Sequence, residues 1–329
     1  MPGPTPLMAA TLLGLIIVAP VAGATTRVLD GHDGRVWDLD HSADGRFLAS
    51  ASTDGTVRIW DLETTATVRI LQPHDGRVRA VAFAPDSQAV ITGDYGGSIR
   101  VWSVPDGRLL RTIAAHVDVV RDLAYSPDGR FIASSSYDKT ARTWRATSGA
   151  AVAVFRGHAD TVNTIAFAPG STTVATGSGS VFNSPPDYRI QLWSVDKGAQ
   201  RTVLSAHTDN VRKLRFSVDG RFLLSGSDDR TVRLWNLSEG AAVATFRGHG
   251  SDIPDVAFVN ADCVVSVSYD RTIRFWRVAD GVPAGRLDGH SSAVWAVSVA
   301  ADGGLASADN DGLIRLWAHD RVAAACEQD

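Results

Sequence analysis

Cysteine is scarce in this sequence: Cys263 and Cys326 are the only two among 329 residues. Two cysteines exclude the network of disulfides that holds many small secreted domains together. A single bridge would use both of them. We expect instead that Cys263 is a small core residue and that Cys326 is a thiol of the C-terminal tail.

An excess of positive charge is also missing. The chain has 32 Lys and Arg against 36 Asp and Glu, which gives a formal net charge of −4 at pH 7. Proteins that bind nucleic acid are usually basic, because their cations neutralise phosphates. The charge balance therefore argues against nucleic acid as a partner.

Two further patterns are absent. There is no glycine-rich phosphate-binding loop, and no segment after the first 24 residues has a convincing helical period of apolar residues. We therefore expect an all-β chain that holds no cofactor.

What the sequence does have is a repeated tryptophan. Seven tryptophans follow one another at intervals of 42, 42, 49, 42, 41 and 41 residues: Trp60, Trp102, Trp144, Trp193, Trp235, Trp276 and Trp317. Similar phrases precede them, such as TDGTVRIW and DDRTVRLW. A period near 42 over most of the chain indicates one supersecondary unit copied seven times.

The repeat from His116 onward predicts four short strands. Residues 120–125, 131–134 and 140–144 are three apolar-rich segments, and 151–155 is a fourth. The segment Ser126-Pro127-Asp128-Gly129 separates the first two with a turn signal. Four antiparallel strands in about 42 residues, with regular turns, suggest the blade of a β-propeller.

These repeats resemble the WD40 family. Each carries a His, then a Ser or Thr ten residues before the Trp, and usually an Asp six residues before it. The histidines are His32, His74, His116, His158, His207, His249 and His290. The hydroxyls are Ser50, Thr92, Ser134, Thr176, Ser225, Ser266 and Ser307, and the carboxylates are Asp54, Asp138, Asp187, Asp229, Asp270 and Asp311. The second repeat departs from the pattern, with Gly96 at the carboxylate position.

The resemblance covers residues 25–317 and implies a seven-bladed propeller in which Trp, Ser or Thr, His and Asp form a hydrogen-bonded chain within each blade. We expect this network in blades 1, 3, 5 and 7 through His32, Ser50, Asp54 and Trp60; His116, Ser134, Asp138 and Trp144; His207, Ser225, Asp229 and Trp235; and His290, Ser307, Asp311 and Trp317. An active site or a metal site does not recur seven times around a ring. We therefore expect these residues to hold the fold, with no catalytic and no metal-binding role, and we expect blade 2 to be the least reinforced.

The last repeat lacks a clear fourth strand after Trp317, whereas a strand-like segment, residues 26–29, precedes the first His. We expect this N-terminal strand to complete blade 7, which is how the family closes its ring. The predicted organisation is a leader over residues 1–24, a propeller over residues 25–318 and a tail over residues 319–329.

The leader has no charged side chain, is apolar over residues 7–21 and ends in Ala22-Gly23-Ala24. This pattern favours a cleaved export signal. An uncleaved membrane anchor, and a disordered leader or misassigned start, are the alternatives. The first two place the propeller outside the cytoplasm, whether secreted, periplasmic or membrane-anchored; the third leaves it cytoplasmic. Any membrane contact would be through residues 1–24.

Function should lie on the propeller faces, where the repeats differ. The resemblance implies that two positions in each repeat line the central opening on one face. Trp, Tyr and Arg are frequent there, and these residue types are enriched in binding hot spots. The candidate partner-binding residues are Trp37, Arg79, Arg121, Tyr137, Arg212, Tyr269 and Trp295, with Phe182 from the insertion. The alternative is that they are ordinary rim residues that pack on their neighbours.

The fourth repeat holds an insertion, GSVFNSPP at residues 179–186. It is predicted to protrude over the same face, either as a contact loop or as a tolerated loop insertion.

We expect a monomeric, non-catalytic scaffold that binds a protein or peptide, with an acidic segment favoured by the arginines. The first alternative is an enzyme, because some propellers of other families are hydrolases or lyases. The sequence shows no unpaired carboxylate dyad, Ser–His set or metal cluster outside the repeats, and His41 and His319 have no evident partner. The second alternative is the sensor domain of a membrane-tethered assembly.

Overall fold

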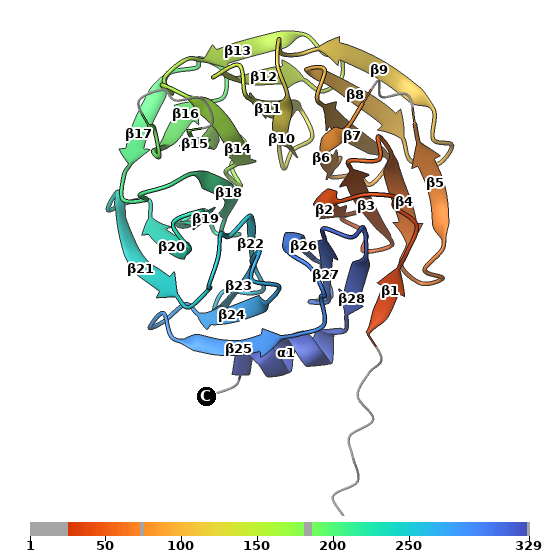
Figure 1. Ribbon diagram of the computed structural model, residues 1–329. Helices are drawn as coiled ribbons and strands as arrows, with labels where there is room; N and C mark the ends of the chain where they lie inside the picture. The colour runs from red at the N-terminus through yellow and green to blue at the C-terminus, as the bar shows by residue number, and fades with distance from the viewer. Residues whose placement is uncertain (1–25, 73–75, 181–185, 328–329) are drawn as a thin grey trace, which may run out of the picture.

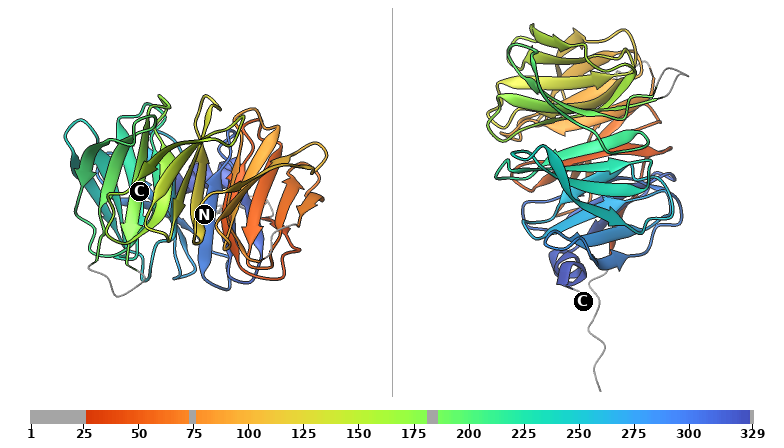
Figure 2. Two further views of the ribbon diagram at one scale, coloured as in Figure 1. Left: turned by 90° about the horizontal axis from the view of Figure 1, so that it is seen from above. Right: turned by 90° about the vertical axis from the view of Figure 1, so that its left-hand side faces the viewer.

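The computed structural model describes residues 26–72, 76–180 and 186–327. Within these residues the chain forms 28 strands and one helix. The strands make seven four-stranded antiparallel sheets, which stand as blades around a common centre (Figure 1). Seen from its edge, the ring is a thick disc (Figure 2). The predicted all-β, seven-bladed propeller is confirmed.

The first strand of each blade faces the centre of the ring. These inner strands are β2 (Val36–His41), β6 (Val78–Phe83), β10 (Val120–Tyr125), β14 (Thr161–Phe167), β18 (Val211–Phe216), β22 (Asp255–Phe258) and β26 (Val294–Val299). The second strands are β3 (Phe47–Ser52), β7 (Ala89–Asp94), β11 (Phe131–Ser136), β15 (Thr173–Gly179), β19 (Phe222–Ser227), β23 (Cys263–Val267) and β27 (Leu305–Asp309).

The third strands carry the repeated tryptophans, and the fourth strands form the outer rim. The third strands are β4 (Val57–Asp61), β8 (Ser98–Ser103), β12 (Ala141–Arg145), β16 (Ile190–Ser194), β20 (Thr231–Asn236), β24 (Ile273–Arg277) and β28 (Ile314–Trp317). The outer strands are β5 (Thr67–Leu71), β9 (Leu109–Ala114), β13 (Ala151–Phe155), β17 (Gln200–Leu204), β21 (Ala241–Arg247), β25 (Pro283–Leu287) and β1 (Arg27–Leu29).

The hydrophobic core lies between neighbouring blades. Ile59 and Leu71 of blade 1 pack in one cluster with Val81, Val90 and Trp102 of blade 2, and all five are buried. Six comparable clusters lie around the rest of the ring. Because both faces of a blade are covered, the second strands are apolar or small along their whole length rather than alternating.

Ring closure follows the prediction. The N-terminal strand β1 pairs antiparallel with β28, with Val28 opposite Arg315, and the sheet order of blade 7 is β1-β28-β27-β26. The first and last repeats therefore share one sheet, which leaves β28 no exposed edge.

The C-terminal residues differ from the expectation of a plain tail. They form a helix, α1 (His319–Glu327), whose Val322 and Ala325 are buried, and it packs on β25 at the rim of the disc (Figures 1 and 2). None of the helices in the described part of the chain combines the length and apolar character needed to cross a membrane.

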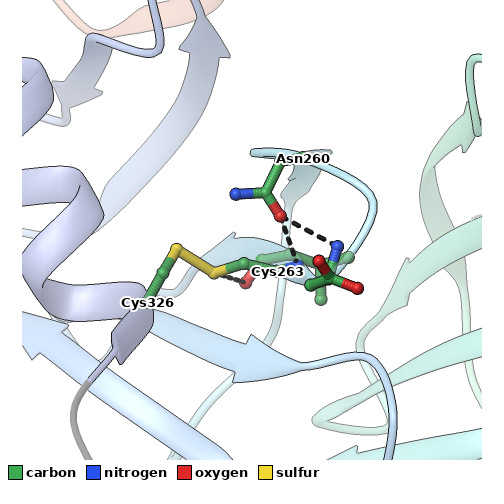
Figure 3. Close-up of a disulfide and its surroundings, with 5 residues drawn as sticks. Asn260, Cys263 and Cys326 are labelled. Carbon is green, nitrogen blue, oxygen red and sulfur yellow. Dashed lines mark hydrogen bonds between the residues drawn. A yellow bond between two sulfur atoms is a disulfide. The ribbon is translucent and has the colours of Figure 1, made fainter.

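The expectation for the two cysteines is wrong, because Cys263 and Cys326 form a disulfide (Figure 3). The helix returns along blade 6 and places the two Cα atoms 5.9 Å apart, although 63 residues separate them in sequence. Asn260 Oδ1 accepts the backbone N–H of Cys263 at 2.9 Å and fixes the turn before β23. The disulfide thus ties the C-terminus to blade 6.

Candidate binding site at one end of the central channel

The inner strands share an irregularity near their start. In six of them the register with the second strand shifts around one residue, as in a β-bulge, and that residue stands five positions after the repeat histidine. In blade 6, Pro254 stands at this place, directly before β22. A bulge turns an additional side chain out of the regular pleat.

The seven residues at this position form what we call the upper ring, and the end of the channel they surround is the upper face. Its members are Trp37, Arg79, Arg121, Asn163, Arg212, Pro254 and Trp295. All seven line one cavity of about 20 Å³ on the axis of the propeller. The ring therefore nearly closes the channel at this end.

Aromatic side chains make one half of the upper ring. The rings of Trp37 and Trp295 meet edge-on with 4.7 Å between centroids, and Tyr269 lies 4.2 Å from Trp295. The guanidinium of Arg35 lies 4.6 Å from the Trp37 ring and 4.2 Å from the Trp295 ring. Blades 6, 7 and 1 thus share a continuous aromatic surface with a cation set into it.

Arginines make the other half. Arg79 lies 4.1 Å from the Trp37 ring, and Arg121 lies 5.1 Å from the ring of Tyr137. Burial, followed by repulsion from Arg121, lowers the pKa of Arg79 to about 9, so both side chains remain cationic at neutral pH. Arg212 differs, because its Nε donates to Asp228 Oδ1 at 2.8 Å.

Several donors in the upper ring have no acceptor among the described residues. They are Nε1 of Trp37 and of Trp295, Nε of Arg79 and of Arg121, and Nδ2 of Asn163. Buried polar groups are nearly always hydrogen-bonded, so five unmatched donors around one cavity need an explanation.

A buried ionic layer lies directly beneath the upper ring, and the sequence analysis missed it. Lys213 Nζ donates to Asp38 Oδ1 at 3.2 Å and to Asp122 Oδ1 at 3.0 Å, so it joins blade 5 to blades 1 and 3. Burial works against both charged forms, yet the two acids raise the pKa of Lys213 and the amine helps to lower the pKa of Asp122.

The same acids join neighbouring blades. Asp38 Oδ2 accepts the backbone N–H of Val81, and Asp122 Oδ2 accepts that of Ile165, at 3.0 and 3.1 Å. A charged residue six positions after a repeat histidine, inside an otherwise apolar strand, was the available signal. The partner could not be read from the sequence, because Lys213 and Asp38 stand 175 residues apart.

The repeated network is present in the described residues of six blades. In blade 3, His116 Nδ1 lies 2.9 Å from Asp138 Oδ2, His116 Nε2 lies 2.8 Å from Ser134 Oγ, and the indole N–H of Trp144 donates to the same hydroxyl at 3.0 Å. Equivalent contacts occur in blades 1, 4, 5, 6 and 7. Since a carboxylate only accepts, Nδ1 carries the proton and Nε2 accepts from the hydroxyl.

Blade 7 corrects the assignment of its carboxylate. The acid that contacts His290 Nδ1, at 2.7 Å, is Asp309 and not Asp311. In other blades a serine stands eight residues before the Trp and the acid six before it; blade 7 has the acid at the end of β27 instead. Asp309 Oδ1 also accepts the N–H groups of Asp311 and Leu313, so it organises the turn.

Blade 2 follows the arrangement of blade 7. Asp94 stands eight residues before Trp102, accepts the N–H of Ser98 at 2.9 Å and forms an ion pair with Arg100. The view that this blade lacks a carboxylate is therefore wrong. The histidine of this repeat, His74, lies outside the described residues.

Both histidines outside the repeat pattern line a hollow of about 370 Å³ between blades 7 and 1, on the lower face. His41 has a partner that the sequence did not reveal: Ser298 Oγ lies 2.8 Å from its Nδ1. That oxygen already accepts the backbone N–H of His41, so the hydroxyl donates to the ring. Burial lowers the pKa of His41 to about 4, which leaves the ring neutral at pH 7.

The leader and most of the insertion, including Phe182, lie outside the described residues. The start of the insertion is anchored, because Ser180 N–H donates to Asn210 Oδ1 at 2.6 Å. Across residues 26–72, 76–180 and 186–327, no three His, Cys, Asp or Glu side chains are grouped to hold a metal ion.

The repeats match a family model seven times. The model for "WD domain, G-beta repeat" matches residues 23–61, 65–103, 107–145, 149–194, 198–236, 240–277 and 281–318. The chain belongs to the WD40 family. WD40 propellers generally act as non-catalytic scaffolds that bind proteins.

Individual relatives share only short stretches with this WD40 chain. It is 34% identical over 111 residues to protein HIRA of Dictyostelium discoideum, which is 26% of this chain and 9% of that protein. It is 44% identical over 63 residues to nuclear distribution protein PAC1 of Coccidioides posadasii, which is 19% of this chain and 13% of that protein. With a periodic tryptophan protein 2 homolog of Neurospora crassa it shares 36% over 85 residues, or 26% and 9%. The chain thus spans a small part of these relatives.

Proposed function

We propose that this WD40 propeller is a non-catalytic scaffold that binds a protein or peptide on its upper face, across the upper ring. The observation that carries the proposal is the continuous cluster of Tyr269, Trp295, Trp37 and Arg79, whose rings and guanidinium lie within 5 Å of their neighbours. Aromatic and Arg side chains that are already packed lose little conformational entropy on binding.

Charge is unevenly distributed over this face and supports a partner of defined orientation. Arg35, Arg79 and Arg121 lie on blades 1 to 3, whereas acids gather on blades 5 and 6. Burial, together with the nearby Asp228 and Asp209, raises the pKa of Asp252. An acidic segment of the partner would lie over the arginines, since opposite charges fix the register of a complex.

The test is capture by the purified propeller, followed by identification of the captured protein and measurement of its Kd. The double variant Trp37→Ala/Arg121→Ala should fold and lose at least a hundredfold in affinity. The lower-face variant Val218→Ser, at a side chain that is 93% exposed, is the matched control and should bind like wild type. If the upper-face variant keeps its affinity while the control loses it, the binding face has been misassigned.

We further propose that the propeller works in an oxidising compartment outside the cytoplasm. The support is the Cys263–Cys326 disulfide, since such bridges persist mainly in exported proteins, together with the signal-like leader. Cell fractionation with N-terminal sequencing of the mature chain is the test. A protein found in the cytoplasm with Met1 retained and both cysteines reduced would contradict export.

A further inference from the structure

The upper ring offers hydrogen-bond donors almost exclusively. Arg121 and Asn163 are 6% and 2% exposed, and each has a nitrogen without an acceptor among the described residues. Arg79 Nε and the indole nitrogens of Trp37 and Trp295 are in the same condition. Guanidinium and indole groups have no acceptor atom at all, so these groups cannot satisfy one another.

The positive charge of the ring is also uncompensated. Neither Arg79 nor Arg121 forms an ion pair within the described residues, and they stand on adjacent blades where they repel each other. The nearest buried acids are already in use: Asp38 and Asp122 bind Lys213 and backbone N–H groups. A buried cation without a partner is costly, and an anion in the cavity would remove that cost.

One position of the ring already shows the complementary arrangement. Arg212 binds the carboxylate of Asp228 through two nitrogens, with Nε at 2.8 Å from Oδ1 and Nη2 at 2.5 Å from Oδ2. This is the forked geometry in which guanidinium groups bind carboxylates. Arg79 and Arg121 present the same group to the cavity without an internal acid.

The size of the cavity limits the ligand. Its volume of about 20 Å³, between the edges of Trp37 and Trp295, leaves room for one small polar group. A flat carboxylate provides about four lone-pair sites, which suits five convergent donors. A tetrahedral phosphate would have to displace an indole.

We propose that the upper ring is a carboxylate-binding site, in which Arg79, Arg121 and Asn163 hold an acidic side chain or the C-terminal carboxylate of the partner. This inference rests on the proposed function for its partner, but the site itself is a property of the free propeller. The carboxylate closes the channel and supplies the acceptors that the upper ring lacks.

The first test needs no partner. Thermal unfolding of the full chain is followed in sodium acetate and in sodium chloride of equal ionic strength at pH 7. A ligand that binds only the folded state raises Tm with concentration. We expect acetate to raise Tm more than chloride does and inorganic phosphate to raise it less than acetate. Equal responses to acetate and chloride would overturn the site, and a larger response to phosphate would overturn the choice of carboxylate.

Variants connect the response to the ring. Arg121→Leu removes the unpaired charge, so it should unfold at a higher temperature without acetate and bind acetate at least tenfold more weakly. Arg221→Leu, an exposed arginine next to Asp219 on the lower face, is the control and should respond like wild type. A wild-type response in Arg121→Leu contradicts the proposal.

Asn163→Asp guards against a folding failure of Arg121→Leu. It places a carboxylate in the cavity from within, so it should raise Tm and abolish the acetate response. An unchanged Tm together with an unchanged response would count against the site.

Two capped amino acids separate the sources of the carboxylate. N-acetylglutamate amide carries it on a side chain, and N-acetylalanine carries it at a C-terminus. A stronger effect of either one over acetate supports the site and identifies the source, whereas no effect of both overturns it. Loss of the acetate response in Arg121→Leu with partner binding unchanged would keep this site and reject the upper face as the docking surface.

Discussion

The nine tryptophans of this chain fall into two sets that differ in one atom's surroundings. In each repeated tryptophan the indole N–H donates to a Ser or Thr hydroxyl of the adjacent strand, at 2.8–3.0 Å. Trp37 and Trp295 have no acceptor among the described residues. The first set completes a network within the blade, whereas the second leaves its hydrogen bonds to a ligand. Satisfied groups that recur hold the frame; unsatisfied groups that do not recur indicate the binding site.

The frame should break most severely where it is covalently closed. Cys326→Ser removes the tie between α1 and blade 6, and a crosslink of this kind typically contributes about 2–4 kcal/mol by limiting the unfolded chain. Urea unfolding of the variant under non-reducing conditions measures the loss. Wild type with its disulfide reduced should match the variant, and a stability that stays at the wild-type level in both would show that the disulfide does not stabilise the fold.

The network should break next. His116→Ala leaves Asp138 and Ser134 buried without their partner, which should cost about 1–3 kcal/mol in the free energy of unfolding. The matched ring variant Trp295→Phe removes an N–H that has no acceptor, so its effect should stay below about 1 kcal/mol. Chemical denaturation of both variants makes the comparison. Equal losses in the two would erase the distinction between frame and ring.

The acid of blade 7 offers a sharper test of the frame. Asp309→Ala removes the partner of His290 and should cost about 1–2 kcal/mol, whereas Asp311→Ala should be close to neutral. The two acids are two residues apart, so each is a control for the other in the same unfolding assay. A larger loss in Asp311→Ala would restore the assignment made from repeat spacing.

Mild acid should weaken the frame with the smallest and most gradual effect. Burial lowers the pKa of His116 and of His207 below the model value of 6.5, although Asp138 and Asp229 oppose the shift. The unfolded state then binds more protons, so this stability is complete above about pH 6.5 and is lost as pH falls below it. Further loss begins near pH 4, because hydrogen bonds from the histidines outweigh burial and lower the pKa values of Asp138 and Asp229.

Tm measured from pH 8 to pH 3 checks this dependence. The variant His116→Ala should show a shallower decline between pH 7 and pH 5 than wild type does. A wild-type Tm that does not change over that interval would show that these histidines are not linked to folding.

Repeat spacing predicted much of this molecule because its information is local. The interval near 42, the turn signals and the missing fourth strand after Trp317 were sufficient for seven blades and for closure by β1. The positions of Trp37, Arg79 and Arg121 were also accessible, since each stands five residues after a histidine. Their unmatched donors were not, because whether a nitrogen has an acceptor depends on side chains from several blades.

The sequence by itself determined the ring, its number of blades and the hydrogen-bonding residues that recur in each repeat. Only the tertiary structure decided that Cys263 meets Cys326, that Asp309 replaces Asp311, and that Lys213 joins Asp38 to Asp122. The physical reason is distance along the chain. A repeat fixes contacts within one blade, whereas the channel and the C-terminal crosslink bring together residues 63 to 175 positions apart.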